Sequence, residues 1–274
     1  MALRSALINV MSNAATKVAR RLVRDFGEVE QLQVSRKGPA DFVSTADLRA
    51  ERDLKTELGK ARPTFGFLME ESGAEQGKDE ASRWIVDPLD GTTNFLHGIP
   101  HFAISIAAEV CDEIVAGVVY DPIRDETFWA DRGSGAYMND KRLRVSARDK
   151  LNDAVFATGI PFHGRDGHGE FLGALETVMS EVAGVRRFGS AALDLAYVAA
   201  GRYEGFWERG LSYWDVAAGI IIVREAGGFV TDFNGDRNHL SKGDIVAAND
   251  KLHDPLLRLV APSFGPLTKN STSR

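Results

Sequence analysis

The sequence predicts a chain of mixed α and β structure, α+β in its first half and α/β in its second. Between positions 101 and 146, apolar residues alternate with polar ones or run continuously, and the segments CDE, DPIRD and RGSG break them. This pattern is typical of antiparallel strands joined by turns. Beyond about position 150, strand-like and helix-like segments alternate, which favours an α/β arrangement. With 274 residues, 44% of them hydrophobic, the chain is long enough for one large domain or two closely joined subdomains.

The first half opens on a helical pattern, since apolar residues recur at helical spacing from Leu3 to Leu22 and arginines lie on the other faces. Polar residues interrupt this segment, so it is interpreted as a helix of the mature protein and not as a signal peptide. The segment 35–41, SRKGPAD, is expected to be a mobile loop, and a second helix is expected from Thr45 to about Leu58. TFGFLMEES and RWIVD are interpreted as strands, and Pro88 is expected to end the hydrogen-bond ladder of the second.

In the second half of the chain, segments with a strand-like pattern alternate with segments with a helix-like pattern. Strands are predicted at DAVFATGI, GVRRFG, YEGFWE, FVTD and DIVAAN. Helices are predicted at GEFLGALETVMSEVA, SAALDLAYVAAG and WDVAAGIIIVREAGG, the last of which ends at a Gly-Gly stop. The polar segment 164–169, GRDGHG, is interpreted as a loop and a candidate seam between subdomains, and the polar tail 266–274 is expected to fray.

Composition excludes several classes of function. A net charge of −6 gives no electrostatic reason to expect nucleic-acid binding. No apolar run approaches the roughly 20 residues that cross a bilayer, so no membrane partner is expected. The single cysteine, Cys111, cannot form an internal disulfide, which fits a reducing cytoplasm. Acids beside it disfavour a reactive thiolate, so a structural role is expected for it.

The segment WIVDPLDGTTNF carries the strongest chemical signal. Asp87 ends a buried strand, and Pro88 turns the chain so that Asp90 can face the same point. Two such carboxylates repel each other unless a cation lies between them, and a hard divalent ion such as Mg²⁺ suits oxygen ligands. Gly91 allows a ligand to approach the backbone, and Thr92-Thr93 open a short helix whose N–H groups favour phosphate. The alternative for DPLDG alone is an ordinary Asx-type turn.

Three further acids follow the same pattern. Glu70 closes the strand in FLMEES, Asp47 begins a helix in DFVSTAD, and Asp215 begins another in WDVAAG. Taken singly, Asp47 and Asp215 are good residues for a helix N-terminus, and Glu70 could be a surface acid. Their occurrence together favours a metal site.

Five segments resemble the inositol monophosphatase family, a group of lithium-sensitive, Mg²⁺-dependent phosphatases whose bacterial-type members are the most similar. They are DFVSTAD, FLMEES, WIVDPLDGTTNFLHGIPHFAISIA, GSAALDLAYVAAG and WERGLSYWDVAAGIIIVREAGG. The resemblance implies a layered αβαβα sandwich with the site where the two halves meet, and commonly a homodimer. It implies one domain over 1–274, with an α+β half at about 1–150, an α/β half at about 151–265 and a flexible tail at 266–274.

The resemblance also implies the residues of the site. It implies two to three Mg²⁺ ions, the first held by Glu70, Asp87 and the carbonyl of Leu89, the second by Asp87, Asp90 and Asp215, and a weaker third by Glu70 and water. It assigns the catalytic water to Asp47 and Thr92, with Glu70 nearby. It assigns the phosphate to the amides of Gly91 and Thr92, and the remaining substrate contacts to Asp90, Ser190, Ala191, Glu208 and Asp215. Arg36 or Lys37 lies where the family has a loop over the metals, and receives no firm role.

The remaining candidates are weaker. The six histidines show no zinc spacing, and His97 and His101 are interpreted as structural or supporting residues. Arg186-Arg187 is either a phosphate contact or a charge pair at a strand end. Trp129 is assigned to the core or to a dimer interface.

The predicted function is therefore Mg²⁺-dependent hydrolysis of inositol monophosphate or a similar polyol or sugar phosphate. Glu208 favours a polyol, because a carboxylate accepts hydrogen bonds from two vicinal hydroxyls. The alternatives are a phosphatase of histidinol phosphate, fructose 1,6-bisphosphate or 3′-phosphoadenosine phosphate, and a binding role in RNA-processing or transcription complexes. Lithium is expected to inhibit the enzyme at high Mg²⁺.

Overall fold

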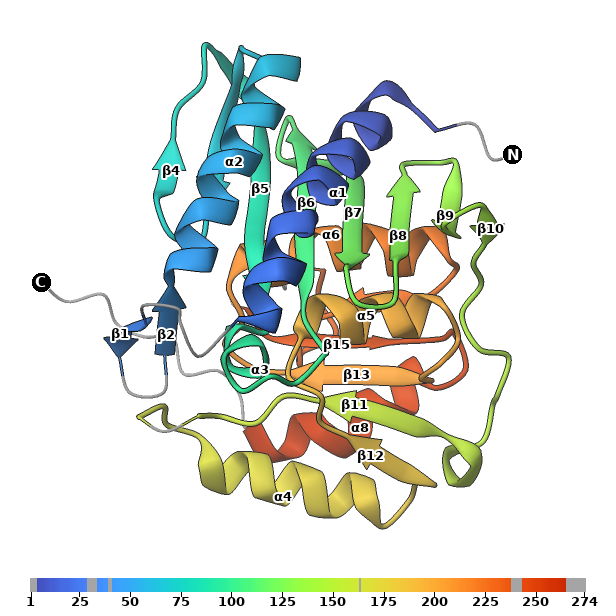
Figure 1. The fold of residues 1–274 in the computed structure, drawn as a ribbon. Coiled ribbons are helices and arrows are strands. Elements are labelled where there is room, and N and C mark those ends of the chain that lie inside the picture. Colours follow the sequence, from blue (N-terminus) through green and yellow to red (C-terminus); the bar gives the residue numbers. More distant parts are fainter. Residues whose placement is uncertain (1–3, 29–33, 39–40, 163, 238–242, 265–274) are drawn as a thin grey trace, which may run out of the picture.

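The computed structural model describes residues 4–28, 34–38, 41–162, 164–237 and 243–264. These residues form five layers, helix, sheet, helix, sheet and helix, as predicted (Figure 1). Two helices cover the outer face of the larger sheet, two lie between the sheets, and two cover the outer face of the smaller sheet (Figure 1).

The larger sheet has eight strands, all of them antiparallel to their neighbours except β3 and β5, which are parallel. In spatial order they are β10 (Lys141–Arg142), β9 (Gly135–Met138), β8 (Glu126–Asp131), β7 (Glu113–Asp121), β6 (Ala103–Val110), β5 (Asp79–Asp90), β3 (Phe65–Met69) and β4 (Gly73–Glu75). The antiparallel run predicted for the middle of the chain is therefore confirmed.

The smaller sheet has five strands, in which β11 is parallel to both of its neighbours and the other pairs are antiparallel. In spatial order they are β12 (Gly184–Arg186), β11 (Val155–Thr158), β13 (Gly205–Glu208), β15 (Ile245–Ala248) and β14 (Phe229–Thr231). Every strand of the larger sheet thus precedes position 150, and every strand of the smaller sheet follows it.

The helices are α1 (Ala6–Gly27), α2 (Thr45–Ala61), α3 (Thr92–Leu96), α4 (His168–Met179), α5 (Ala191–Ala199), α6 (Tyr213–Glu225) and α8 (His253–Phe264). A short 3-10 helix, η2, covers Leu151–Asp153. α1 and α2 form the first layer, α5 and α6 the middle one, and α4 and α8 the last (Figure 1). None of the helices in the described part of the chain is both long and apolar enough to cross a membrane.

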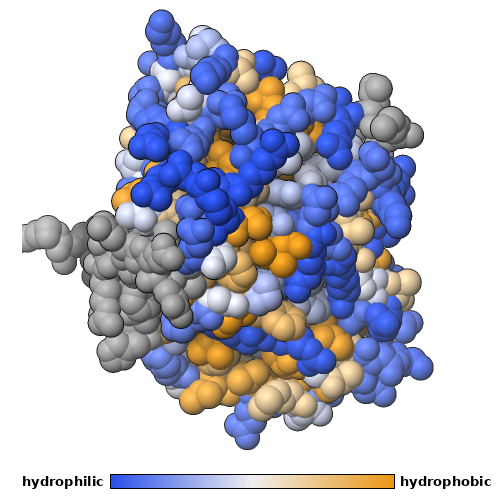
Figure 2. Space-filling model, viewed as in Figure 1, coloured by the Kyte–Doolittle hydropathy of each residue, from blue (hydrophilic) through white to orange (hydrophobic). Residues whose placement is uncertain are grey.

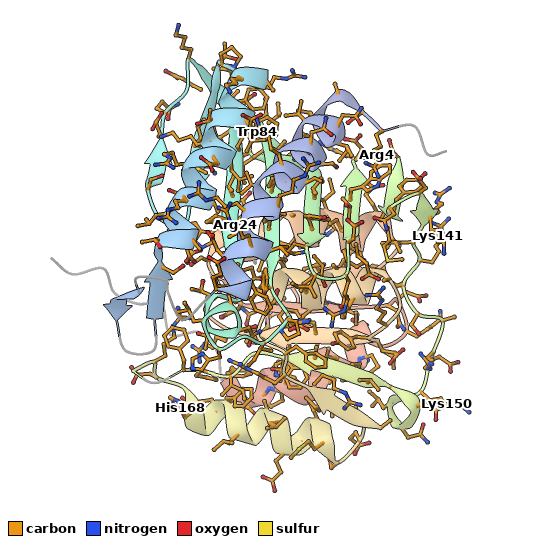
Figure 3. The ribbon with its side chains drawn as sticks, viewed as in Figure 1. Arg4, Arg24, Trp84, Lys141, Lys150 and His168 are labelled. Carbon is orange, nitrogen blue, oxygen red and sulfur yellow. The ribbon has the colours of Figure 1, made fainter. Side chains whose placement is uncertain are left out.

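The continuous apolar run of β5 is explained by a sheet that is buried on both faces. Trp84 and Val86 pack against α1 and α2, while Ile85, pointing the other way, packs against the middle helices. Trp84 lies behind these outer helices in Figure 3. A strand that contacts helices on both faces cannot alternate apolar and polar residues, so its pattern becomes unbroken.

The predicted N-terminal helix is confirmed, and its polar residues have local explanations. Met11, Val18 and Leu22 are buried, whereas Leu3 lies outside the described residues. Ser5 caps the helix, because its side chain accepts a hydrogen bond from the Ile8 amide.

One local prediction is wrong. The segment 35–41 was expected to be a mobile loop, but β1 (Val34–Gly38) pairs antiparallel with β2 (Asp41–Ser44), and residues 39–40 lie outside the described part. Cys111, for which a structural role was expected, is exposed in the turn between β6 and β7, where it and Asp112 both have positive φ. A two-residue hairpin needs that geometry, so the turn and not the sulfur determines its position.

The face shown in Figure 2 is mostly hydrophilic over the outer helices, and apolar side chains gather in its lower half. There α4 carries exposed Leu172 and Met179. The polar surface of α1 and α2 matches the one-sided hydrophobic pattern of a helix that covers a sheet.

Candidate active site

The end of β5 supplies the first part of the site. Pro88 was expected to stop the ladder, but β5 continues to Asp90 and pairs with β6 on both sides of an irregularity between Asp87 and Asp90. Pro88 lacks an N–H, so it is accommodated where the register shifts. The Leu89 amide donates to Asp87 Oδ1 at 2.8 Å, so the Asx-type turn is present as well. The turn and the paired acids therefore belong to one feature.

Gly91 follows directly and must be glycine. Its φ is 100°, and a Cβ at this position would lie 3.1 Å from the His101 carbonyl oxygen and 3.3 Å from the Gly189 carbonyl oxygen. This left-handed residue turns the chain into α3, which begins at Thr92. Thr92 Oγ1 lies 3.0 Å from Asp47 Oδ1 and 3.1 Å from the Leu89 carbonyl oxygen, and its single proton can be donated to either.

Asp47 has both roles that its position suggested. Its Oδ2 accepts from the Ser44 amide at 2.9 Å and contacts the Ser44 hydroxyl, so it caps α2. Its other oxygen accepts from Thr92, a residue of another element. Burial raises the pKa of Asp47, and these hydrogen bonds oppose the rise. The helix cap thus holds a buried carboxyl against the end of β5.

The predicted metal and substrate residues line one cavity of about 170 Å³. They are Glu70, Asp87, Leu89, Asp90, Gly91, Thr92, Ser190, Ala191, Glu208 and Asp215. They come from the ends of β3, β5 and β13 and the beginnings of α3, α5 and α6. Asp47 does not line this cavity and reaches it through Thr92. Asp47 and Asp215, which are 168 positions apart in the sequence, are thus part of one site, as the motifs predicted.

The acids of this cavity repel one another. Burial raises the pKa of Asp87 well above its usual value, and the charges of Glu70, Asp90 and Asp215 raise it further. Burial and Asp90 raise the pKa of Asp215 in the same way. Burial raises the pKa of Asp90 to about 6 despite hydrogen bonds from the Ser190 hydroxyl at 2.5 Å and the Ala192 amide at 2.8 Å.

This donor set fits a hard divalent cation. Its candidate ligands are carboxylate oxygens plus the Leu89 carbonyl, and the pKa of Asp87 is raised by burial and by the charges of the neighbouring acids. Among the described residues, no three or more His, Cys, Asp or Glu side chains are placed so that together they could hold a metal ion. Mg²⁺ keeps several of its waters, so smaller sets of carboxylates completed by a carbonyl and water are enough for it.

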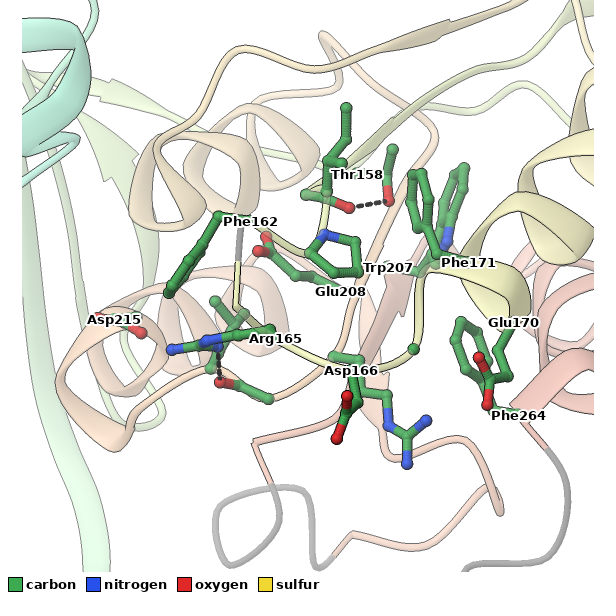
Figure 4. Close-up of a pocket in the computed structure, with 17 residues that line it drawn as sticks. Thr158, Phe162, Arg165, Asp166, Glu170, Phe171, Trp207, Glu208, Asp215 and Phe264 are labelled. Atoms are coloured by element: carbon green, nitrogen blue, oxygen red, sulfur yellow. Dashed lines mark hydrogen bonds between the residues drawn. The ribbon is translucent and has the colours of Figure 1, made fainter. Parts of the chain in front are cut away.

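A second, larger cavity of about 490 Å³ adjoins the first (Figure 4). Both are lined by Gly159, Ile160, Phe162, Glu208, Leu211 and Asp215. Gly159 makes room for the Glu208 carboxyl, because a Cβ there would lie 1.9 Å from its Cδ atom. Burial raises the pKa of Glu208 to about 8, and Asp90 adds to the rise while Arg187 and Arg165 oppose it. Glu208 thus stands between the two cavities.

Some residues of the site had no clear signal in the sequence. Gly159 and Phe162 follow the end of β11, and Asp194, which lines neither cavity, lies inside the helix SAALDLAYVAAG. Asp194 is buried, its Oδ1 has no hydrogen-bond partner among the described residues, and burial followed by Glu208 raises its pKa well above the usual value. Arg187 lines the smaller cavity and Arg186 lines neither, which separates a pair that the sequence left open.

Other candidates lie outside the cavities. His101 is buried against Phe188, and burial lowers its pKa to about 4, while a ring nitrogen of His97 lies 2.8 Å from the Thr93 carbonyl oxygen. Trp129 is buried and its indole N–H donates to the Asn139 carbonyl, in agreement with the core assignment. Arg36 and Lys37 lie on β1, but their side chains are outside what the structure describes.

Comparisons with known proteins agree with this geometry. The family model of the inositol monophosphatase family matches residues 3–263. Inositol-1-monophosphatase of Mesorhizobium japonicum is 61% identical over 257 residues, which cover 94% of this chain and 97% of that relative. Nus factor SuhB of Pseudomonas aeruginosa is 44% identical over 267 residues, which cover 96% of this chain and 98% of that relative. The crystal structure of extragenic suppressor protein suhB from Bartonella henselae matches with a TM-score of 0.91 and 61% identity, over 93% of this chain and 98% of that one.

Proposed function

The chain belongs to the inositol monophosphatase family, and we propose that it is a Mg²⁺-dependent phosphomonoesterase that hydrolyses inositol monophosphate or a similar polyol phosphate. The observation that carries this proposal is the single cavity lined by acids, by the Gly91-Thr92 turn and by Glu208. Relatives named inositol-1-monophosphatase that are 55–61% identical support the same activity. The proposed setting is the cytoplasm, and the proposed assembly is a homodimer.

In this proposal Glu70, Asp87, Asp90, Asp215 and the Leu89 carbonyl hold two or three Mg²⁺ ions. When bound, these ions would lower the pKa of a water molecule and neutralise charge on the phosphoryl and leaving oxygens. The mutual repulsion of the acids supports this assignment, because a cation between them removes its cause.

The catalytic water is proposed to be oriented by Thr92. When the Thr92 hydroxyl donates its proton to Asp47 Oδ1, its oxygen lone pairs are left to accept from a water in the cavity. Asp47 is itself fixed by the Ser44 amide, so this acceptor is preorganised. Glu70 lines the same cavity and is proposed to accept the one proton that this water loses as it attacks phosphorus.

The substrate contacts are proposed to divide between two sides. The Gly91 and Thr92 amides bind the phosphate, while Ser190, Ala191 and Glu208 face the alcohol. Ser190 donates to Asp90 and accepts from the Leu193 amide, so one lone pair of its hydroxyl oxygen remains to accept from the substrate. Glu208 accepts from vicinal hydroxyls of the polyol.

The first experiment measures phosphate release from inositol 1-phosphate, histidinol phosphate, fructose 1,6-bisphosphate and 3′-phosphoadenosine phosphate, with Mg²⁺ and with EDTA. We expect Mg²⁺-dependent release that is fastest from the inositol ester, and inhibition by added lithium. If another ester is fastest, the polyol assignment is wrong while the metal assignment stands. Release that persists undiminished in EDTA contradicts the metal assignment itself.

Glu208→Gln tests the alcohol side. The amide keeps the shape but replaces one carboxyl oxygen with an N–H₂ donor that cannot accept from a hydroxyl, so kcat/KM for inositol 1-phosphate should fall about tenfold or more relative to that for p-nitrophenyl phosphate. Glu176→Gln, an exposed change on α4, is the matched control. If the two substrates lose activity in parallel, Glu208 does not read the polyol.

A second candidate function is binding within a transcription or RNA-processing complex, because relatives named Nus factor SuhB are 43–44% identical to this chain. The two functions do not exclude each other. A variant that is folded but has no phosphatase activity distinguishes them, and Asp87→Asn is expected to be such a variant.

A further inference from the structure

Tyr213 begins α6 two residues before the proposed metal ligand Asp215, yet it lines neither cavity. α6 crosses the inner face of the larger sheet, where it contacts β5, β6, β7 and β8 (Figure 1). Asp215 belongs to this helix, whereas Asp87 and Asp90 belong to β5. The distance between the two groups of proposed ligands therefore depends on how the start of α6 lies on the sheet.

β5 and β6 bring three pairs of residues to the face of the sheet that α6 covers. The register pairs Arg83 with Glu109, Ile85 with Ala107, and Asp87 with Ser105. These pairs share one face, since every second residue of a strand points the same way. One end of this row thus carries the proposed metal ligand Asp87, and the other end carries Glu109, about 13 Å away along the strands.

Polar side chains on this face hold the start of α6 at two points. The Ser105 hydroxyl donates to the Trp214 carbonyl at 3.2 Å, and the Tyr213 hydroxyl donates to the Glu109 carboxylate. Tyr213 and Trp214 also pack against the buried core between the sheets. Asp215 is the next residue of the helix, so the two hydrogen bonds fix the turn that carries it.

Glu109 is itself held in place as the acceptor for Tyr213. Its side chain is only 6% exposed, and its other carboxylate oxygen accepts from Arg83 Nε at 2.6 Å. The Arg83 guanidinium carbon lies 5.8 Å from the centre of the Tyr213 ring. A buried carboxylate with hydrogen bonds to both oxygens has little freedom to move. Arg83, Glu109 and Tyr213 thus connect β5, β6 and α6.

We propose that Tyr213 is a positioning residue that sets the Asp215 carboxylate relative to Asp87, so that the site binds Mg²⁺ tightly. This inference rests on the proposed phosphatase function. In this proposal Tyr213 contacts neither substrate nor metal, and it acts through the helix start that its hydroxyl ties to Glu109. Mg²⁺ demands a nearly ideal octahedron of oxygen ligands, so a small displacement of one carboxylate weakens its binding.

The test measures Mg²⁺ binding by calorimetry without substrate, and the Mg²⁺ concentration for half-maximal hydrolysis of inositol 1-phosphate. Tyr213→Phe should raise the dissociation constant and the half-maximal concentration about fivefold. This is less than the roughly tenfold or greater loss that is typical when a group in direct contact with a metal ligand is removed. The rate at saturating Mg²⁺ should stay close to that of the wild type, because excess metal refills the site.

Tyr137→Phe is the matched control. It also removes a tyrosine hydroxyl, which donates to the Ser134 carbonyl at 3.3 Å and lies outside both cavities. Both Mg²⁺ values should stay at the wild-type level in this variant. The melting temperature of every variant is measured in EDTA, so that a loss of stability is distinguished from a loss of Mg²⁺ affinity.

Glu109→Ala tests the same hydrogen bond from the acceptor side. It should weaken Mg²⁺ binding at least as much as Tyr213→Phe does. The double variant Tyr213→Phe/Glu109→Ala should match Glu109→Ala alone, since one hydrogen bond can be lost only once.

Three results overturn the inference. The first is a Tyr213→Phe variant that binds Mg²⁺ as the wild type does, even if its melting temperature is lower, because Tyr213 would then only stabilise the fold. The second is a double variant in which the two effects multiply. The third is an equal loss of Mg²⁺ affinity in Tyr137→Phe. A wild type that neither binds Mg²⁺ nor releases phosphate in its presence contradicts the proposed function itself, and the inference falls with it.

Discussion

Asp87→Asn is expected to lower Mg²⁺-dependent phosphate release by about a thousandfold, since metal ions supply several kcal/mol of transition-state stabilisation. Asp87 is buried at the end of β5, and its pKa is raised by burial and by Glu70, Asp90 and Asp215. An amide keeps the oxygen that accepts from the Leu89 amide but removes the charge shared by the proposed ions. The measurement is phosphate release from inositol 1-phosphate at saturating Mg²⁺.

The same variant makes an opposite prediction for stability in EDTA. Removing one of several buried, mutually repelling carboxylates should leave the melting temperature equal to that of the wild type or higher, because uncompensated buried charge destabilises a fold. The increase in melting temperature on adding Mg²⁺ should then be smaller in the variant. Asp149→Asn, at an exposed position, is the control and should behave as wild type in both assays.

A clear result also separates the two candidate functions. Asp87→Asn can be expressed in cells from which the gene has been deleted. If the variant is folded and inactive but still reverses the phenotype of the deletion, that phenotype depends on binding and not on hydrolysis. A variant that keeps its activity and its response to Mg²⁺ would show that Asp87 holds no essential metal.

The sequence predicted those parts of the site that sit at the ends of secondary-structure elements. Asp87, Asp90 and Asp215 could be found because a strand end or a helix start determines where such a side chain lies. The layered fold and the family resemblance were confirmed for the same reason, since the motifs carry both. The interpretation of DPLDG as an Asx turn was offered as an alternative, yet the turn is what positions the acids.

What the sequence could not predict depends on contacts between layers. Gly159 matters only because Glu208 of a neighbouring strand fills the space that a side chain would take. Asp194 looks like an ordinary helical acid, but the middle layer buries it. Arg186 and Arg187 have the same residue type, but Arg187 lines the smaller cavity and Arg186 lines neither cavity. These contacts depend on how the layers pack together, so no pattern in the neighbouring sequence predicts them.

Substitution of Gly117 is expected to have the largest effect on the stability of the fold. It lies on β7, paired with Ala107 of β6 and Ala130 of β8, at the point where α6 crosses the sheet. A Cβ there would lie 2.7 Å from Ile221 Cγ2 and 2.9 Å from both Cα and the carbonyl oxygen of Ala218. Two of these are backbone atoms of α6, which cannot rotate away as a side chain can.

Nor can α6 retreat, because its opposite face is equally close to α5. A Cβ on Gly219 would lie 2.5 Å from Leu195 Cδ1, so the helix is held between β7 on one side and α5 on the other. Gly117→Val should therefore destabilise the protein by about 3 kcal/mol, typical of severe overpacking. That corresponds to a melting temperature lower by roughly 6–12 °C.

The control is Gly169→Val, also a glycine-to-valine change, at a helical position where a Cβ would meet no atom within 4 Å. It should lower the melting temperature by much less. If Gly117→Val does not fold, the smaller Gly117→Ala is measured in its place, because one methyl group already enters the distance at which the backbone must move. Equal melting temperatures for the Gly117 and Gly169 variants would contradict the close approach.

Helix α6 also carries Asp215 in its first turn, so a displacement of the helix should affect the proposed metal site as well as stability. Asp215 accepts from the Ser212 amide at 2.7 Å, and Ser105 of β6 donates to the Trp214 carbonyl at 3.2 Å, so the start of α6 is tied to the large sheet. A helix displaced at Gly117 should move this carboxylate relative to Asp87 and Asp90. The Gly117 variant should therefore need more Mg²⁺ for half-maximal activity, whereas a purely local loss of packing would leave that concentration unchanged.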